Sequence, residues 1–401
     1  MNINIPHQVN FIIDTLESAG YEAFIVGGCV RDVLRNVIPK DWDIATSATP
    51  TQAKALFSRT VDTGIKHGTI TVLLDRKHYE VTTYRIDGEY LDSRRPETVE
   101  FVSNIEEDLS RRDFTMNAIA YNPSEGFIDP FLGQEDINKK IIRCVGNPKQ
   151  RFTEDALRML RAVRFSGVTG FDICSQLLKA IFKLKHNLAN VSPERIREEL
   201  GKLITSPQPG AVEFLHTTGL LPFVLGGRNY KGDIYEVILW LKKCPTIETM
   251  RMALFLHWVG EDCENILRSL RFDNKSIKEI SLYVRMLHMP IKHSRYEIKK
   301  ILRHIPPDIF DNFLTLKTII VTDKEEILGG IRQEAADIIR KGDCFTLRDL
   351  AISGNDLAAI GIPKGKKMGV ALEDMLDLVM QYPNLNTKDS LLEILQNRVI
   401  S

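Results

Sequence analysis

Two adjacent glycines between a strand pattern and a helix pattern constrain the N-terminal part of this chain more than any other feature. Gly27 and Gly28 follow the segment "YEAFIV" and precede "VRDVLRN". Glycine lets the backbone approach a phosphate closely, and a helix N-terminus offers free N–H groups and a partial positive charge. No GK[ST] follows, so this is not a P-loop. The pattern predicts a phosphate-binding turn made by Gly28 and the helical Arg31.

Asp-Trp-Asp lies at the start of the next strand pattern, "DWDIAT". Alternation along a strand predicts Asp41 and Asp43 on one face, with Trp42 and Ile44 directed toward a core on the other. Adjacent carboxylates repel each other unless a cation lies between them. Mg²⁺ is typically held by one or two carboxylates together with substrate phosphates. Two solvated aspartates would explain the tripeptide alone, but the neighbouring phosphate-binding turn favours a Mg²⁺ site at Asp41 and Asp43.

The combination GG-x-V-R-D followed by D-x-D resembles the first signature of the nucleotidyltransferases of the DNA polymerase β type. It is most similar to the class II branch, which holds the bacterial tRNA CCA-adding enzymes and the poly(A) polymerases. In that family the two aspartates hold the metal ions, so the resemblance implies that Asp41 and Asp43 are catalytic. The signature falls on these positions: Gly27, Gly28, Arg31, Asp32, Asp41 and Asp43.

Local patterns predict a small mixed sheet around these residues. Thr49 is the expected N-cap of a helix that begins at Pro50. The segment "GTITVLLDRKHYEVTTYR" alternates as a hairpin with its turn near residues 75–77. Glu80, on the returning strand, is a candidate for the third carboxylate that often completes such sites. An exposed strand glutamate explains Glu80 equally well.

The segment "RRDFTMNAIAYNP", residues 111–123, resembles a second signature of the same family. Arg112 could bind the triphosphate or the ribose, and Asn117 could donate a hydrogen bond to a sugar hydroxyl. The alternative is a surface charge cluster of Arg111, Arg112 and Asp113 above buried apolar side chains.

The segment "RFTEDALRMLRAVRF", residues 151–165, is predicted to be one amphipathic helix. Asp155, Arg158, Arg161 and Arg164 follow one stripe. A solvated helix with an Asp155–Arg158 ion pair is the simplest explanation of that stripe. At about 100° per residue, apolar side chains gather on the other face: Phe152, Ala156, Met159, Leu160 and Val163.

An Asp–Arg pair also suits one set of nucleotides. Carboxylate accepts and guanidinium donates, which matches cytosine and adenine and leaves uracil and guanine mismatched. A mismatch would leave buried polar groups unpaired, at about 1–3 kcal/mol each. The segment resembles the family's E-D-x-x-R motif, in which amino acids act as the template, here Glu154, Asp155 and Arg158. The resemblance also implies nucleotide-binding roles for Arg161 and Arg164.

The predicted fold is α+β: a nucleotidyltransferase head with a small mixed β-sheet, followed by an all-α neck, body and tail. The expected boundaries are 1–146 for the head, 147–205 for the base-selecting neck, 206–300 for the body and 301–401 for the tRNA-binding tail. The polar segment from Arg85 to Phe101 resembles the family's flexible loop. Lys364, Lys366 and Lys367 could contact an RNA backbone, or could simply be solvated.

Length and composition bound the class of protein. The 401 residues carry no net charge, so an RNA partner must meet a local basic patch. Six scattered cysteines without a CxxC pair predict no zinc site. No signal peptide and no long apolar run is evident, so we expect a cytoplasmic protein without a membrane anchor. Trp258 follows His257, so the His-Asp pair of phosphohydrolase domains is absent, and His257 is expected to be a packed helix residue.

The resemblance implies addition of CCA to tRNA 3′ ends from CTP and ATP, with Mg²⁺ as the cofactor. An A-adding enzyme and a poly(A) polymerase share every motif and stay open as alternatives. An inactive RNA-binding protein is a third alternative, which the intact Asp41 and Asp43 disfavour. The sequence leaves a monomer and a homodimer equally open.

Overall fold

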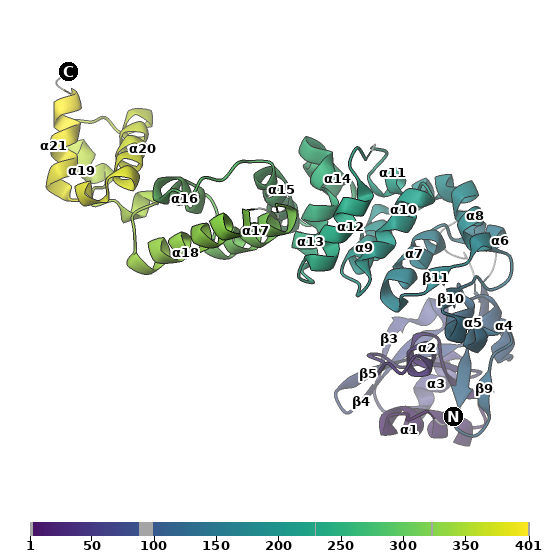
Figure 1. Cartoon of the computed structure of the whole chain (residues 1–401). Coiled ribbons are helices and arrows are strands. Elements are labelled where there is room, and N and C mark those ends of the chain that lie inside the picture. The colour runs from purple at the N-terminus through teal and green to yellow at the C-terminus, as the bar shows by residue number, and fades with distance from the viewer. Residues whose placement is uncertain (1–2, 88–98, 229, 322–323, 400–401) are drawn as a thin grey trace. The chain divides into compact units, whose positions relative to one another are not determined.

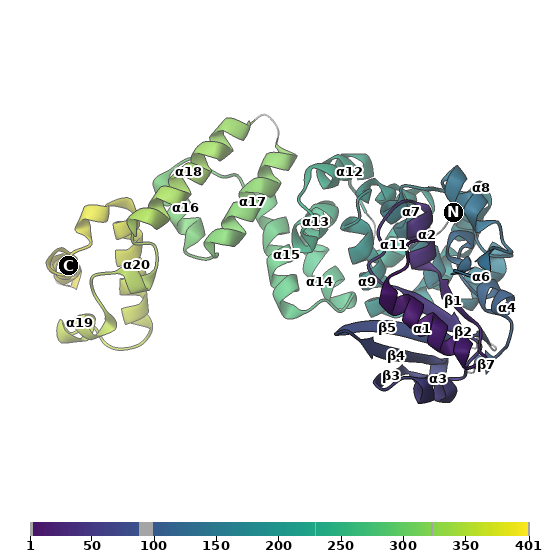
Figure 2. The same cartoon turned by 90° about the horizontal axis from the view of Figure 1, so that it is seen from below.

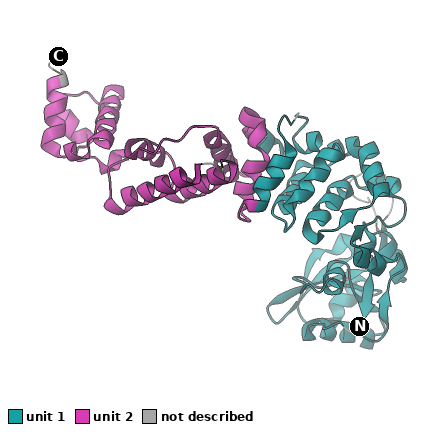
Figure 3. Cartoon of the chain, viewed as in Figure 1, with its two compact units in different colours: residues 1–242, 265–272 teal, residues 243–264, 273–401 magenta. Residues whose placement is uncertain are grey.

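The computed structural model describes residues 3–87, 99–228, 230–321 and 324–399. The chain forms two compact units (Figure 3): unit 1 comprises Met1–Lys242 and Asn265–Phe272, and unit 2 comprises Lys243–Glu264 and Asp273–Ser401. The division into head, neck, body and tail at the expected boundaries stays a prediction. Within the expected loop from Arg85 to Phe101, residues 88–98 lie outside the described residues.

Unit 1 begins with a mixed sheet of seven strands in the order β3-β4-β5-β2-β1-β8-β9 (Figure 1). Helices α1 and α3 pack against each other and against this sheet (Figure 2). The sheet and the helices beyond it confirm the predicted α+β class. The strands are β1 (Ala23–Val26), β2 (Asp43–Thr46), β3 (Thr60–Gly64), β4 (Thr69–Leu74), β5 (Lys77–Thr83), β8 (Ala120–Asn122) and β9 (Gly126–Ile128).

Strand β2 is shorter than the sequence pattern predicted. It begins at Asp43, and Asp41 lies in the segment before it, so the prediction of both aspartates within one strand is wrong. The reason is the length of β1: Ile25 pairs with Ile44, and the chain turns into helix α2 directly after Val26. No β1 residue is left to pair with Asp41. On the other side of β2, Asp43 pairs with Glu80 in a parallel register.

The predicted hairpin and helix cap are confirmed. In the hairpin, Leu74 pairs with Lys77. Asp75 and Arg76 form the two-residue turn with φ of 50° and 62°, as a type I′ turn requires. Thr49 caps helix α3 through a capping box, with Pro50 at its first position.

The expected single helix over residues 151–165 is wrong, because two helices meet at Asp155. Asp155 has extended φ and ψ of −140° and 103°. Its Oδ1 accepts the backbone N–H of Leu157 at 3.0 Å, so the side chain satisfies a free donor at the start of the second helix. The predicted apolar face is confirmed: Phe152, Ala156, Met159, Leu160 and Val163 are all buried.

The remainder of both units is almost entirely helical. In unit 1 the helices include α1 (His7–Ser18), α2 (Gly28–Leu34), α3 (Pro50–Leu56), α4 (Ile105–Ser110), α6 (Pro148–Glu154), α7 (Leu157–Thr169), α8 (Ser175–Leu184) and α9 (Pro193–Ile204). In unit 2 they include α13 (Glu248–Phe255), α15 (Asn274–Leu287), α16 (Arg295–Leu302), α17 (Pro307–Ile320), α18 (Glu325–Lys341), α19 (Gly354–Ala359), α20 (Lys366–Gln381) and α21 (Lys388–Val399). None of the helices in the described part of the chain is long and apolar enough to cross a membrane.

His257 is packed inside unit 2, as the sequence predicted. Its ring stacks on His288 with the ring centroids 4.3 Å apart. Burial first, and then the positive charge of His288 and Lys317, lower the pKa of His257 from 6.5 to about 4. The folded protein therefore keeps His257 neutral at pH values where the unfolded chain would protonate it.

We expect unit 2 to lose stability as the pH falls from 6.5 toward 4. Between pH 7 and pH 5 the loss from His257 should be about 2 kcal/mol. Urea unfolding at both pH values measures it, with His257→Gln as the variant that lacks the titrating group. Equal losses in the wild type and the variant would show that His257 does not cause the acid sensitivity.

Candidate active site

The turn after β1 depends on Gly27 more than on Gly28. Gly27 has a φ of 76°, and a Cβ at this position would lie 2.9 Å from Nη1 of Arg112. A Cβ at Gly28 would make only an ordinary contact of 3.7 Å with Nη2 of Arg31. Because Gly27 has no side chain, the guanidinium of Arg112 can occupy the space beside its backbone. Helix α2 starts at Gly28 without a side-chain cap, so the phosphate-binding role of Gly28 stays a prediction.

Three acidic residues lie near this turn. Asp41, Asp43 and Glu80 are all exposed, and Asp43 lies beside Glu80 in the sheet. The pKa of Asp43 is raised, first by the surrounding protein, which displaces water from the carboxylate, and then by the charge of Glu80. Asp41 raises the pKa further, whereas Arg112 lowers it.

This acidic set fits a divalent cation. Oxygen ligands and uncompensated like charges are what a hard cation would bind and neutralise. Among the described residues, no three histidine, cysteine, aspartate or glutamate side chains are grouped so that they could hold a metal ion. Glu80 therefore does not complete a three-ligand group with Asp41 and Asp43 in this structure.

Arg112 is fixed beside the turn by Asp108, which the sequence analysis did not single out. Asp108 is 1% exposed. Its Oδ2 accepts hydrogen bonds from Nε and Nη2 of Arg112 at 3.3 and 2.9 Å. Its Oδ1 accepts from Nε and Nη2 of Arg111 at 3.0 and 2.6 Å. The sequence contained a signal for these ion pairs, because Asp108 lies three and four residues before Arg111 and Arg112 at the end of a helix pattern.

Arg31 is buried, not pointed at solvent. Its Nη1 donates to Oδ1 of Asn117 at 2.8 Å, and its Nε donates to Oδ1 of Asp32 at 2.9 Å. The side chain also lies over the ring of Phe165, 5.2 Å from the centroid. Arg31 thus ties α2 to the second signature and to α7, and its contact with a phosphate stays a prediction.

Asp113 is buried, so the alternative of a surface charge cluster is wrong. Oδ2 of Asp113 accepts Nε of Arg161 at 2.8 Å, and Oδ1 accepts Nδ2 of Asn117 at 3.1 Å. Burial alone would raise the pKa of Asp113. The charge of Arg161 and the hydrogen bond from Asn117 outweigh burial and bring this pKa to about 2.

Asp155 and Arg158 do not pair with each other, so the expected i,i+3 ion pair is wrong. Asp155 pairs with Arg195 of α9, whose Nη2 lies 2.8 Å from Oδ2. Nη1 of Arg158 lies 3.1 Å from Oε2 of Glu154, and its Nη2 donates to the carbonyl of Arg111 at 3.2 Å. Arg158 is 7% exposed, so it is not on a solvated face.

Helix α9 also holds the later arginines of α7. Glu199 is buried, and its Oε2 accepts Nε of Arg164 at 2.5 Å. Its Oε1 lies 4.0 Å from Nη1 of Arg161. Arg195 and Glu199, which the sequence analysis did not select, are four residues apart and so lie on one face of α9.

Three consecutive residues, Arg111, Arg112 and Asp113, connect the residues that the sequence predicted for the site. Arg112 packs on Gly27 and lowers the pKa of Asp43. The carbonyl of Arg111 accepts Arg158, and the carboxylate of Asp113 accepts Arg161. Residues 111–113 therefore join the acidic site of the sheet to the arginine stripe of α7.

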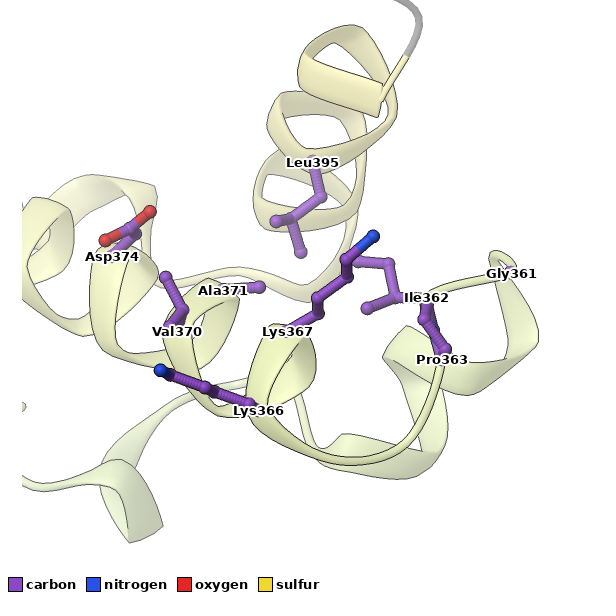
Figure 4. A pocket seen from close by; sticks show the side chains of 9 residues that line it. All are labelled: Gly361, Ile362, Pro363, Lys366, Lys367, Val370, Ala371, Asp374 and Leu395. Atoms are coloured by element: carbon purple, nitrogen blue, oxygen red, sulfur yellow. The ribbon is translucent and has the colours of Figure 1, made fainter.

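The basic turn of unit 2 is exposed, as predicted. Lys366 and Lys367 line a cavity of about 560 Å³ together with Ile362, Val370 and Leu395 (Figure 4). Lys364 is exposed in the same turn. The contact of these three lysines with RNA stays a prediction.

We expect Gly27→Ala to be more harmful than Gly20→Ala. Both glycines have positive φ, 76° and 86°, but a Cβ at Gly20 would meet no atom within 4 Å. Each change should cost on the order of 1 kcal/mol in backbone strain. Gly27→Ala should cost more and weaken CTP binding, because Arg112 can move away only by leaving Asp108. Urea unfolding and titration calorimetry measure both effects. Equal losses in the two variants would contradict the packing of Arg112 on Gly27.

Three family models match successive parts of the chain. The poly A polymerase head domain matches residues 23–143, and an RNA and SrmB-binding site of polymerase A matches residues 170–228. Domain 2 of tRNA nucleotidyltransferases matches residues 245–395.

Whole-chain comparisons agree with these matches. The CCA-adding enzyme of Lactobacillus johnsonii is 36% identical over 96% of this chain and 95% of its own. That of Oceanobacillus iheyensis is 38% identical over 93% of both chains. The crystal structure of the Bacillus stearothermophilus CCA-adding enzyme in complex with CTP superimposes with a TM-score of 0.84 at 32% identity, covering 99% of each chain. The chain belongs to the family of CCA-adding enzymes, within the class II nucleotidyltransferases.

Proposed function

We propose that this protein adds C, C and A to the 3′ end of tRNA from CTP and ATP, without a nucleic-acid template and with release of pyrophosphate. The observation that carries the proposal is the junction at residues 111–113. Within this junction, Arg112 packs on Gly27, and the carbonyl of the neighbouring Arg111 accepts a hydrogen bond from Arg158 of the proposed base-selecting motif. The relative solved in complex with CTP supports CTP as a substrate of this chain.

Asp41 and Asp43 are the proposed ligands of Mg²⁺. When bound, the metal ions would lower the pKa of the tRNA 3′ hydroxyl and neutralise charge on the pyrophosphate that leaves. The residues fit this role because the pKa of Asp43 is raised, first by burial and then by the negative charge of Glu80, and a cation would relieve both effects.

The chain's own residues orient the nucleotide. The turn at Gly27 and Gly28, with Arg112 fixed by Asp108, would bind the triphosphate. Arg31, Arg161 and Arg164 are the further proposed nucleotide-binding residues, and each is held in position by a carboxylate or an amide within the protein.

Base choice would rest on Asp155 and Arg158. Asp155 accepts hydrogen bonds and can receive the exocyclic amine of cytosine or adenine, and Arg158 can donate to the ring nitrogen. The burial of Arg158 strengthens this choice, since a mismatched base would bring a polar group without a hydrogen-bond partner into a buried site. Asp155 is paired with Arg195, and Arg158 is paired with Glu154, so the protein fold fixes the distance between Asp155 and Arg158.

Incubation with three tRNAs tests the function. The tRNAs end before CCA, after C and after CC, and CTP and ATP are supplied singly and together. Completion of all three to CCA is the expected result. Extension of only the CC-ended tRNA would identify an A-adding enzyme, a long A tail would identify a poly(A) polymerase, and no extension would identify an RNA-binding protein. We infer that the reaction takes place in the cytoplasm, where its substrates are made.

We expect Arg158→Ala to relax base choice. The kcat/KM for CTP and ATP should fall by at least about tenfold, since a charged hydrogen bond is lost. The values for UTP and GTP should fall less or rise. Arg197→Ala on α9 is the matched control, because Arg197 lies outside this set of contacts and packs over Phe272 instead. Unchanged ratios among the four nucleotides, with only a lower overall rate, would contradict the assignment.

A further inference from the structure

A cavity of about 980 Å³ is lined by Asp41 but not by the glycine turn. Its walls are the segment before α1, the connection from α2 to β2, and the tip of the β4–β5 hairpin. Asp41 and Trp42 line it, whereas Gly27, Arg112 and Asp43 do not. The cavity therefore meets one of the two proposed metal ligands from a direction different from that of the glycine turn.

The rim of this cavity is basic. Lys40, Arg76, Lys77 and His78 line it and are all exposed. Lys40, Arg76 and Lys77 form no ion pair with any residue that the structure describes. Asp41 is the one acidic residue among the described lining residues. In a chain of zero net charge, three cations against one carboxylate at a cavity form a local site for an anion.

The basic hairpin tip is held in place. The two-residue turn puts Asp75 and Arg76 in the left-handed region, which fixes the course of the backbone. Nε2 of Gln8 in α1 donates to Oδ2 of Asp75 at 3.0 Å, so the turn is tied to the helix below it. Arg76 and Lys77 are thus presented from a fixed support.

Apolar side chains also line the cavity. Val37 and Ile38 are 45% and 91% exposed, and Trp42 and Pro39 lie beside them. A cavity whose lining combines exposed cations with exposed apolar or aromatic side chains matches the surfaces that bind single-stranded nucleic acid, where phosphates meet the cations and bases or riboses meet the apolar groups.

The geometry of phosphoryl transfer selects the ligand. The attacking hydroxyl and the leaving pyrophosphate lie on opposite sides of the reacting phosphorus. If the triphosphate occupies the turn at Gly27, the attacking RNA end must approach the aspartates from another side. The cavity at Asp41 supplies such an approach. We propose that this cavity binds the backbone phosphates of the RNA strand whose 3′ end is extended, through Lys40 on one wall and Arg76 and Lys77 on the other.

The proposal rests on the proposed function, and its test separates the two. The full-length protein is titrated with a fluorescent RNA hairpin that ends in an unpaired CC, over a series of salt concentrations. For Arg76→Gln/Lys77→Gln we expect the Kd to rise about tenfold at physiological salt, and the slope of log Kd against log salt to fall by about 1.5 for two lost phosphate contacts. The KM for CTP should stay unchanged. Lys40→Gln, on the other wall, should lower the slope by about half as much.

Arg59→Gln/Lys66→Gln is the matched control. It removes the same charge at exposed residues that flank strand β3 and do not line the cavity. It should leave the salt slope at the wild-type value. Three results would overturn the proposal: equal effects of the control and the hairpin variant, no effect of Lys40→Gln, or a raised KM for CTP with unchanged RNA affinity, which would place the triphosphate in the cavity. If the wild type adds no nucleotide, the proposed function fails, and the binding series still decides whether RNA occupies the cavity.

Discussion

One buried carboxylate, Asp108, determines how the two halves of the site meet. It accepts hydrogen bonds from two consecutive arginines, one on each oxygen. Burial alone would raise the pKa of Asp108, but the charges of Arg112 and Arg111 bring it below the ordinary value. A buried charge whose partners were removed would destabilise the fold by several kcal/mol, on the order of 3–5. The two arginines are therefore fixed before any nucleotide arrives.

The second constraint is that the charged side chains along α7 form ion pairs with residues of different structural elements. In the proposed base-selecting segment, Asp155 and Arg164 are held by Arg195 and Glu199 of α9, and Arg161 is held by Asp113. A site whose polar groups are already held in place discriminates between bases by hydrogen-bond geometry, because little reorganisation is needed when the base binds. The break at Asp155 contributes to this, since it frees the carboxylate from the helical stripe and turns it toward α9.

Local sequence patterns predicted much of the fold, but they could not predict features that depend on pairing between residues far apart in the sequence. The strand, the glycine turn, the Thr49 cap and the hairpin each depend on a few consecutive residues, and all are present. The strand limit at Asp43 depends on where β1 ends, which the sequence of β2 does not contain. Helical periodicity could not reveal the break at Asp155, because a capping side chain replaces the lost backbone bond without altering the apolar pattern. The partners of Arg161 and Asp155 are 48 and 40 residues away, beyond any spacing rule.

The most direct measurement of this account compares Asp108→Asn with Asp136→Asn. Asp136 is also buried and also pairs with an arginine, Arg143; it accepts a hydrogen bond from Thr115 but, among the described residues, none from residues 111–113. We expect Asp108→Asn to raise the KM for both CTP and ATP by at least about tenfold while the protein remains folded by circular dichroism, because a charged pair on each arginine is lost. Asp136→Asn should change stability but leave both KM values near those of the wild type. A folded Asp108→Asn variant with wild-type kcat/KM would contradict the central role given to Asp108.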